Sequence, residues 1–306
     1  MLFQEILNTK YRVLKPEFDK LFQKILQNQT HPGDLLLAHQ NGFYSPEVYE
    51  FDNEGKYSPY MLGPGSEGHS EDTHYEFIGH YVNNNLTTQT LSAYLEKVKY
   101  DPEKIKEVDK LSHIESISVQ NEMLIYLKVW EADSFIKTFY EIALLLHSEP
   151  YDWHFKIKES FRDKDATGNR DTIIRNLIRD KFKDDFPLIY EAFKRAFVTQ
   201  MRNAIAHSQY IIIGRHITLN NYIKNDAAAQ LKVVSFDRWI DIFHETIIIH
   251  SLYHEFLTAT LNHYENLSIL NNHSYEVRVN MLFPRKETKY WKVGYDPHFK
   301  IWGGSA

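Results

Sequence analysis

Long segments in which apolar residues recur every three or four positions place the strongest constraint on how this chain can fold. In residues 118–147, apolar side chains such as Phe135 and Phe139 fall on one face of a helix, and that face is wide enough to pack in a bundle. Residues 187–207 and 236–267 have the same spacing. The sequence therefore predicts a mainly α-helical protein whose second half is a helical bundle.

The segments outside these helices have weaker patterns. Residues 1–30 have helical spacing, Thr87 or Thr88 can cap a helix that follows, and residues 171–183 form a basic helical pattern. Residues 31–68 are rich in Gly, Pro, Ser and Tyr, which predicts loops with one or two short strands. The first part of the chain is therefore expected to be a mixed α/β region.

Two short segments have patterns typical of β-structure, a turn between apolar residues in the first and apolar–polar alternation in the second. Residues 210–219 are expected to form a β-hairpin inserted between bundle helices, and residues 276–281 are expected to form a strand. We therefore divide the chain into an N-terminal region of unknown family (1–117), a helical bundle (118–270) and a β-containing, basic and aromatic C-terminal tail (271–306).

The composition excludes several kinds of site. The chain has no cysteine, so disulfides, thiolate metal ligands and cysteine nucleophiles are excluded. Its 35 basic and 41 acidic residues give a net charge of -6, so contact with nucleic acid needs a local basic surface. No apolar run approaches the roughly 18 residues of a membrane span, and residues 1–10 are too polar for a signal peptide. We expect a cytoplasmic protein that has no membrane contact.

The stretch Arg-Asn-Ala-Ile-Ala-His at residues 202–207 is the most informative candidate site. Arg202 is a permanent cation whose planar guanidinium suits phosphate oxygens, and His207 is of the type that ordinarily titrates near neutral pH. Such a pair suits proton transfer at a phosphodiester. On a continuous helix Asn203 and His207 are one turn apart, whereas Arg202 lies about 140° around the axis from His207. The two groups can line one groove if the helix end bends or if a second subunit completes the site.

This Arg-Asn-x-x-x-His stretch, at the end of a bundle helix and followed by another long helix, resembles the Arg-x(4–6)-His signature of the HEPN superfamily. The resemblance covers roughly residues 118–267, and it implies a compact bundle that forms a homodimer with two motifs at a shared cleft. Many HEPN members are metal-independent ribonucleases of toxin–antitoxin, abortive-infection and other antiviral defence systems. Members that pair with a nucleotidyltransferase antitoxin often have a tyrosine two positions after the histidine, whereas Tyr210 stands three positions after His207.

The resemblance also implies a reaction and a role for each residue. A ribonuclease that needs no metal uses the ribose 2′-OH as its nucleophile, and it requires a base, an acid and a cation. His207 is expected to act as base or acid, Arg202 to clamp the phosphate, and Asn203 to orient the histidine or the phosphate. The expected protein is an endoribonuclease that acts on RNA with no cofactor and no metal, with an antitoxin or sensor as a partner. The alternative is a non-catalytic HEPN-type module in which Arg202 and His207 bind a ligand or stabilise a dimer.

Further basic and aromatic residues are candidates for contact with RNA. Arg175 and Arg179 share one face of the predicted basic helix, and Tyr210 stands just after the motif. The tail mixes cations with aromatic rings, which suits single-stranded nucleic acid. Its cations are Arg285, Lys286, Lys289, Lys292 and Lys300, and its rings are Tyr290, Trp291, Tyr295, Phe299 and Trp302. A solvated helix face and an aromatic strand packed on the body are the alternative interpretations.

Two groups of histidines leave a metal-dependent hydrolase as a third interpretation. His250 and His254 are one helical turn apart with His244 upstream, but they lack the glutamate that follows the first histidine in zinc-protease helices. The second group is irregularly spaced in a predicted loop, and it comprises His69, His74 and His80.

Two remaining features complete the set of candidates. Residues 63–70 are Gly-rich, but His69 stands where a phosphate-binding loop needs lysine, so a flexible turn is expected. Glu131, Asp133 and Glu141 are the acidic residues that can pair with Arg202 or His207.

Overall fold

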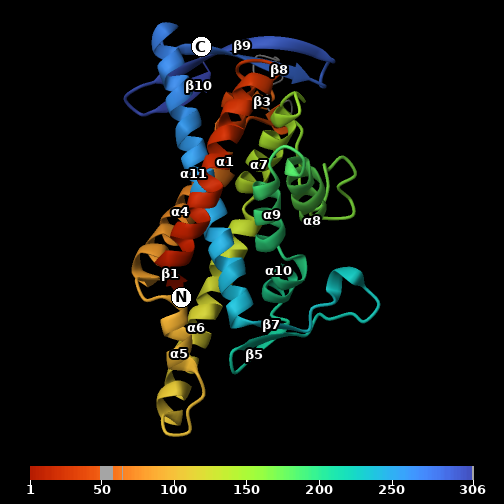
Figure 1. The fold of residues 1–306 in the computed structure, drawn as a ribbon. Helices are drawn as coiled ribbons and strands as arrows, with labels where there is room; N and C mark the ends of the chain where they lie inside the picture. Colours follow the sequence, from red (N-terminus) through yellow and green to blue (C-terminus); the bar gives the residue numbers. More distant parts are fainter. Residues whose placement is uncertain (49–57, 64, 305–306) are drawn as a thin grey trace. The chain divides into compact units, whose positions relative to one another are not determined.

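The computed structural model describes residues 1–48, 58–63 and 65–304, and Figure 1 shows its course. Helices dominate, and the strands among the described residues form two- and three-stranded sheets. The predicted mainly α-helical class is confirmed, with β-structure confined to small sheets that include the C-terminal segment.

The chain forms two compact units, each assembled from three separate segments. Unit 1 comprises Met1–Pro16, Thr73–Ala132 and Pro187–Leu252. Unit 2 comprises Glu17–Asp72, Asp133–Phe186 and Tyr253–Ala306. These limits do not coincide with those expected after residues 117 and 270, so the division into three domains stays a prediction.

The helices are, in chain order, α1 (Gln4–Asn28), α2 (Asp34–His39), α4 (Gly65–Asn85), α5 (Leu91–Val98), α6 (Ile105–Glu131), α7 (Asp133–Leu146), α8 (Arg170–Thr172), α9 (Pro187–Ala196), α10 (Thr199–Ala206) and α11 (Phe236–Leu270). The strands are β1 (Leu2–Phe3), β2 (Phe43–Tyr44), β3 (Tyr60–Met61), β4 (Leu86–Thr87), β5 (Tyr210–Ile213), β6 (His216–Leu219), β7 (Val233–Ser235), β8 (Ser274–Met281), β9 (Glu287–Asp296) and β10 (Ile301–Gly304).

Unit 1 is built around the aromatic face of α6. Val119, Met123, Tyr126 and Trp130 recur every three or four positions, so they fall on one side of the helix, and all four are buried. The Tyr126 ring lies 5.5 Å from that of Trp239 on α11. This shared core fixes the C-terminal end of α6, which carries Glu131.

A tertiary contact separates α10 from α9. The Tyr126 hydroxyl donates to the carbonyl of Ala196 (3.1 Å) and accepts from the N–H of Val198 (3.0 Å). Because these backbone groups bond to a side chain, Val198 takes up an extended conformation and the helix is interrupted. The prediction of one helix over residues 187–207 is therefore wrong.

A second interruption divides the helix predicted over residues 118–147. α6 ends at Glu131, Ala132 has an extended backbone (φ -70°, ψ 111°), and α7 begins at Asp133. Every residue of α7 from Ser134 to Leu146 is buried, including the polar side chains of Lys137 and Glu141. The single helix expected there is wrong, although both parts are helical.

The sheet β5–β6–β7 follows α10 in unit 1. β5 and β6 pair antiparallel from Tyr210↔Leu219 to Ile213↔His216, and Gly214 supplies the left-handed turn residue (φ 54°). The predicted hairpin is thus confirmed, and β7 adds a third strand to it.

The helix expected to start at Thr87 or Thr88 begins later. Thr87 is extended because β4 pairs with β1 in parallel. Thr90 is the cap instead, since its hydroxyl accepts the N–H of Ala93 (3.2 Å). The capping prediction at Thr87 or Thr88 is therefore wrong, and α5 is eight residues long.

Residues 31–68 belong to unit 2 and contain the two expected short strands, β2 and β3, which pair antiparallel. The loop prediction is wrong where α2 forms and again from Gly65 onward, where α4 begins and replaces the expected turn. His69, His74 and His80 consequently belong to α4 rather than to a loop. Residues 49–57 and 64 of this region lie outside the described residues.

Unit 2 also contains the sheet β10–β9–β8, whose middle strand is β9. β8 and β9 pair from Ser274↔Gly294 to Met281↔Glu287, so the strand predicted over residues 276–281 is confirmed. Within the described residues, β10 pairs with β9 over residues 293–296.

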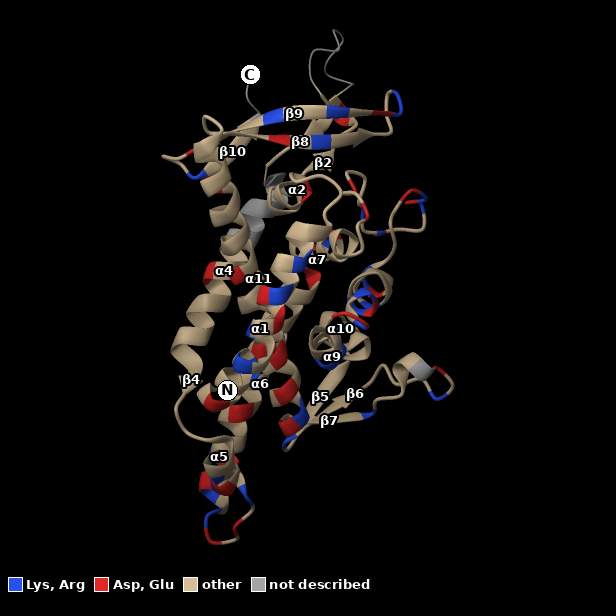
Figure 2. Cartoon of the chain, turned by 45° about the horizontal axis from the view of Figure 1, so that its top comes forward, with Lys and Arg blue, Asp and Glu red and all other residues tan. Residues whose placement is uncertain are grey.

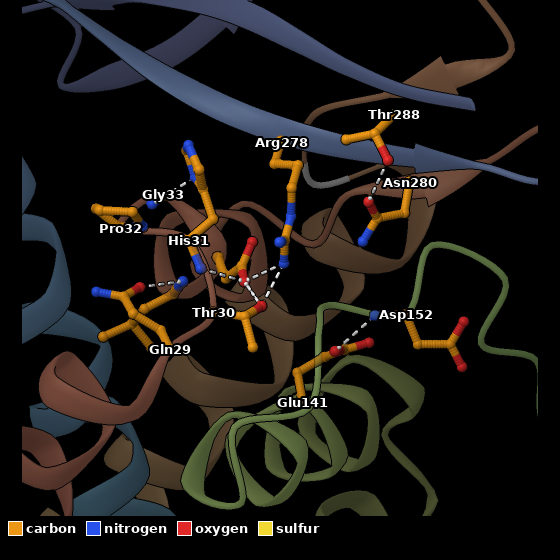
Figure 3. A network of polar contacts seen from close by, with 12 residues as sticks. Gln29, Thr30, His31, Pro32, Gly33, Glu141, Asp152, Arg278, Asn280 and Thr288 are labelled. Carbon is orange, nitrogen blue, oxygen red and sulfur yellow. Dashed lines mark hydrogen bonds and ion pairs between the residues drawn. The ribbon is translucent and has the colours of Figure 1, made fainter.

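Arg278 of β8 anchors this sheet to the chain around α2 (Figure 3). Its Nη2 donates to Oδ2 of the buried Asp34 (2.9 Å) and to the hydroxyl of Thr30, and the N–H of His31 donates to the same carboxylate oxygen (3.0 Å). Burial outweighs these contacts and raises the pKa of Asp34. The charge-assisted bonds nevertheless fix the position of β8 within unit 2.

Candidate functional site

α10 presents the candidate motif in unit 1. Met201, Ala204 and Ile205 are spaced three and one residues apart, so they share one face of the helix, and that face is buried. Arg202 and Asn203 are half-buried beside it, and His207 is exposed at the helix end. The local sequence therefore buries the apolar side of α10 and leaves the polar residues of the motif at its surface.

The Arg202 guanidinium is held by two oxygen acceptors. Nε donates to Oε1 of Glu131 at the end of α6, in a hydrogen-bonded ion pair, and Nη1 donates to Oδ1 of Asn203 (2.8 Å). Among the described residues, Nη2 donates no hydrogen bond to the protein. The guanidinium is therefore oriented by the protein, and the Arg202 side chain is 22% exposed.

The backbone at His207 is fixed by the way α10 ends. His207 is the C-cap, and its N–H donates to the carbonyl of Asn203 (3.1 Å). Ser208 takes a left-handed conformation (φ 53°), so that its N–H bonds to Ile205 (3.2 Å) and that of Gln209 bonds to Ala204 (2.7 Å). These are the two hydrogen bonds of a Schellman motif. Within the described part of the chain the imidazole has no hydrogen-bond partner, so it can meet a ligand.

Of the three acidic residues that the sequence offered as partners, only Glu131 contacts the motif. Asp133 accepts a hydrogen bond from Arg170 (2.5 Å) within unit 2. Glu141, also in unit 2, is fully buried and accepts from the N–H of Asp152 (3.1 Å).

The additional RNA-contact candidates are divided between the two units. Arg175 and Arg179 belong to unit 2, in a π-helical segment (Ile173–Ile178) and a 3-10 turn (Arg179–Phe182) rather than in the expected regular helix. Each pairs with a neighbouring carboxylate: Arg175 with Asp171 (3.6 Å) and Arg179 with Asp180 (2.7 Å). Tyr210 opens β5 in unit 1 and is half-buried.

The histidines considered as metal ligands include one with a clear structural role. His244 is buried, its Nδ1 donates to the carbonyl of Ile240 (2.6 Å), and its Nε2 accepts from the N–H of Phe3 (2.8 Å). Burial lowers the pKa of His244 to about 4, so the ring is neutral. In the described part of the chain no three His, Asp or Glu side chains are grouped as a metal site would require.

Sequence reasoning missed Tyr126, whose hydroxyl sets the start of α10. No local signal identifies it, because its two partners lie about 70 residues further along the chain. The sequence also could not show which of the three acidic residues pairs with Arg202, because the position of Glu131 depends on where α6 ends.

No family model, curated protein or solved structure matches this chain. The resemblance to HEPN domains therefore rests on the motif and on the order of helices around it. None of the described helices is long and apolar enough to cross a membrane.

Proposed function

We propose that this chain is a HEPN-type endoribonuclease that cleaves RNA without a metal ion. The observation that carries the proposal is the arrangement at the end of α10, where a guanidinium held by Glu131 and Asn203 lies on the same short helix as an exposed histidine. A held cation and an accessible imidazole are the two groups that attack by a ribose 2′-OH requires.

In the proposed reaction His207 takes the proton from the 2′-OH as the oxygen attacks phosphorus. The bond from O2′ to phosphorus forms, the bond from phosphorus to O5′ breaks, and the products are a 2′,3′-cyclic phosphate and a 5′-OH. Nη2 of Arg202 binds a non-bridging oxygen and stabilises the charge of the transition state. Asn203 orients the guanidinium of Arg202, because the Oδ1 of Asn203 accepts a hydrogen bond from Nη1 of Arg202.

The leaving O5′ needs an acid, and one His207 cannot be base and acid in the same step. We infer that a second copy of the chain supplies the other histidine, so that the active form is a homodimer. A cytoplasmic role in toxin-like or antiviral defence, with an antitoxin or sensor as partner, follows from the family analogy alone.

The ion pair with Glu131 supports a second candidate function, a non-catalytic binding or dimerisation module. A carboxylate already neutralises Arg202, as expected for a residue that stabilises the fold. The two functions differ in one measurable way, because a module of this kind binds without cleaving RNA.

The test is RNA cleavage in EDTA with analysis of the product ends. Wild type should yield cyclic phosphate and 5′-OH ends, and His207→Ala and Arg202→Ala should each slow cleavage by about 100-fold or more. His216→Ala and Arg238→Ala are matched controls, because both residues are exposed in unit 1 and lie outside the motif. Full activity of His207→Ala, or loss of cleavage in EDTA, would contradict the proposal.

A further inference from the structure

A groove in unit 2 is lined by part of β9 and by the segment that contains β3. Its volume is about 530 Å³, and it is lined by Ser58, residues 60–62 and residues 290–293. Successive side chains of a strand point to opposite faces, so Tyr290 and Lys292 face one side of the sheet and Trp291 faces the other. Among the described residues, β10 pairs with β9 from Val293 onward and not at residues 290–292, which belong to the groove lining.

The aromatic side of the groove is fixed by the core of unit 2. Tyr60 is 2% exposed, and its hydroxyl accepts the N–H of Leu282 (2.8 Å). Its ring centre lies 5.6 Å from that of Trp153 and 6.4 Å from that of Trp291. Trp291 is therefore held in a rigid aromatic layer and is only half-buried.

Tyr290 provides an open ring beside this layer. It is 58% exposed, and the His31 ring lies 5.5 Å away at an angle of 47°, which is too tilted for stacking. An exposed tyrosine on a paired strand is a preformed platform on which a planar base can stack.

The C-terminal sheet that contributes residues 290–293 to the groove has a positive net charge, although the chain as a whole is negative. Residues 274–304 carry six Lys or Arg and three Asp or Glu, whereas the chain has a net charge of -6. Figure 2 shows basic residues on both β8 and β9. Arg285, Lys286 and Lys292 are exposed and form no ion pair with any other described residue.

We propose that this groove binds single-stranded RNA, with a base stacked on Tyr290 and a phosphate on Lys292. The choice of RNA rests on the proposed ribonuclease function. The choice of a single strand rests on the groove itself, because a groove lined by aromatic rings accepts unpaired bases, which a duplex keeps stacked inside its helix.

The test measures binding of a labelled 12-nucleotide oligouridylate by fluorescence anisotropy over a range of salt concentrations. His207→Ala is the background, so that the probe is not cleaved. Tyr290→Ala should weaken binding about ten-fold, equivalent to about 1.4 kcal/mol, without changing the salt dependence. Lys292→Ala should lower the slope of log K against log salt by about 0.7, the value for one phosphate contact to a single strand.

Lys99→Ala and Tyr100→Ala are the matched controls, because their side chains are 71% exposed and lie in unit 1. Both should bind the probe as the background does. Unchanged binding by Tyr290→Ala and Lys292→Ala would overturn the proposal, and so would equal affinity for a duplex of the same length.

The two proposals can fail separately. If the probe binds through Tyr290 and Lys292 but wild type cleaves no RNA, the ribonuclease function fails and the groove assignment stands. If wild type cleaves RNA but both groove variants bind as the background does, the groove assignment alone fails.

Discussion

Removal of the Arg202 side chain should impair RNA cleavage far more than it impairs folding. The Arg202 and Glu131 side chains are 22% and 31% exposed, so solvent screens their ion pair, which we expect to contribute about 1 kcal/mol or less. The bond from Nη1 to Asn203 contributes about another 1 kcal/mol. Arg202→Ala should therefore lower the free energy of unfolding by about 1–2 kcal/mol.

Such a loss leaves the protein folded, since native domains are stable by about 5–15 kcal/mol. Loss of a donor to the transition state costs more, about 2.7–4 kcal/mol or a factor of about 100 to 1,000 in rate. Folded Arg202→Ala should thus cleave RNA at about 1% of the wild-type rate or less.

Glu131→Gln is the variant that distinguishes a catalytic role of Arg202 from a purely structural one. It keeps the shape of the partner and removes its charge, so Arg202 stays in place and its charge is no longer neutralised. We expect cleavage by Glu131→Gln to stay within about ten-fold of wild type. A double-mutant cycle of Glu131→Gln and Arg202→Ala in urea unfolding should give a coupling energy of about 0.5–1 kcal/mol.

The assays are urea unfolding followed by far-UV circular dichroism and cleavage of RNA in EDTA. Two results would contradict a catalytic role for Arg202. One is near-wild-type cleavage by folded Arg202→Ala, and the other is an equal loss of cleavage in Glu131→Gln and Arg202→Ala.

Three other substitutions should change stability in defined directions. Ser208→Gly should raise the free energy of unfolding by about 0.5–1 kcal/mol, because Ser208 has φ 53°, and an unchanged Tm would contradict this. Trp239→Phe removes the 2.7 Å hydrogen bond to buried Glu122 and should cost about 1.5–3 kcal/mol in urea unfolding. A negligible cost would mean that the hydroxyls of Tyr81 and Ser118, which also donate to Glu122, satisfy the carboxylate. Burial raises the pKa of Glu141 well above its usual range. The protonated Glu141 side chain therefore contributes its full stabilisation below the ordinary pKa of glutamate, and this stabilisation is lost as the pH rises through the raised pKa. Glu141→Gln should flatten this decline when unfolding is measured from acid to mildly alkaline pH, and an unchanged pH profile would argue against it.

The predictable parts of the fold are those that local patterns determine. Gly214 between two segments of strand-forming residues was sufficient to place the hairpin of β5 and β6, because its left-handed backbone supplies the turn. The break between α9 and α10 could not be predicted, since it depends on the hydroxyl of Tyr126, which lies far away in sequence. The start of α5 was misplaced for a similar reason, because pairing with β1 draws Thr87 into a strand.

The candidate site was predictable in its residues but not in its geometry. Arg202, Asn203 and His207 were singled out by chemistry and spacing, and the structure places all three on α10 or at its end. Helical geometry suggested that Asn203 would face His207, whereas its side-chain oxygen accepts from Arg202. A side-chain amide can turn to either neighbour, and the position of Glu131 determines where the guanidinium lies.

The shortness of α10 limits how the motif can be used outside this protein. Isolated helices of fewer than about 12–15 residues are marginal in water, and α10 has eight. Its conformation depends on the Tyr126 hydroxyl at one end and on the left-handed Ser208 at the other. A peptide with the sequence of residues 199–209 would lack the first of these, so transplanting the six residues into another scaffold would transfer their chemistry but not their geometry.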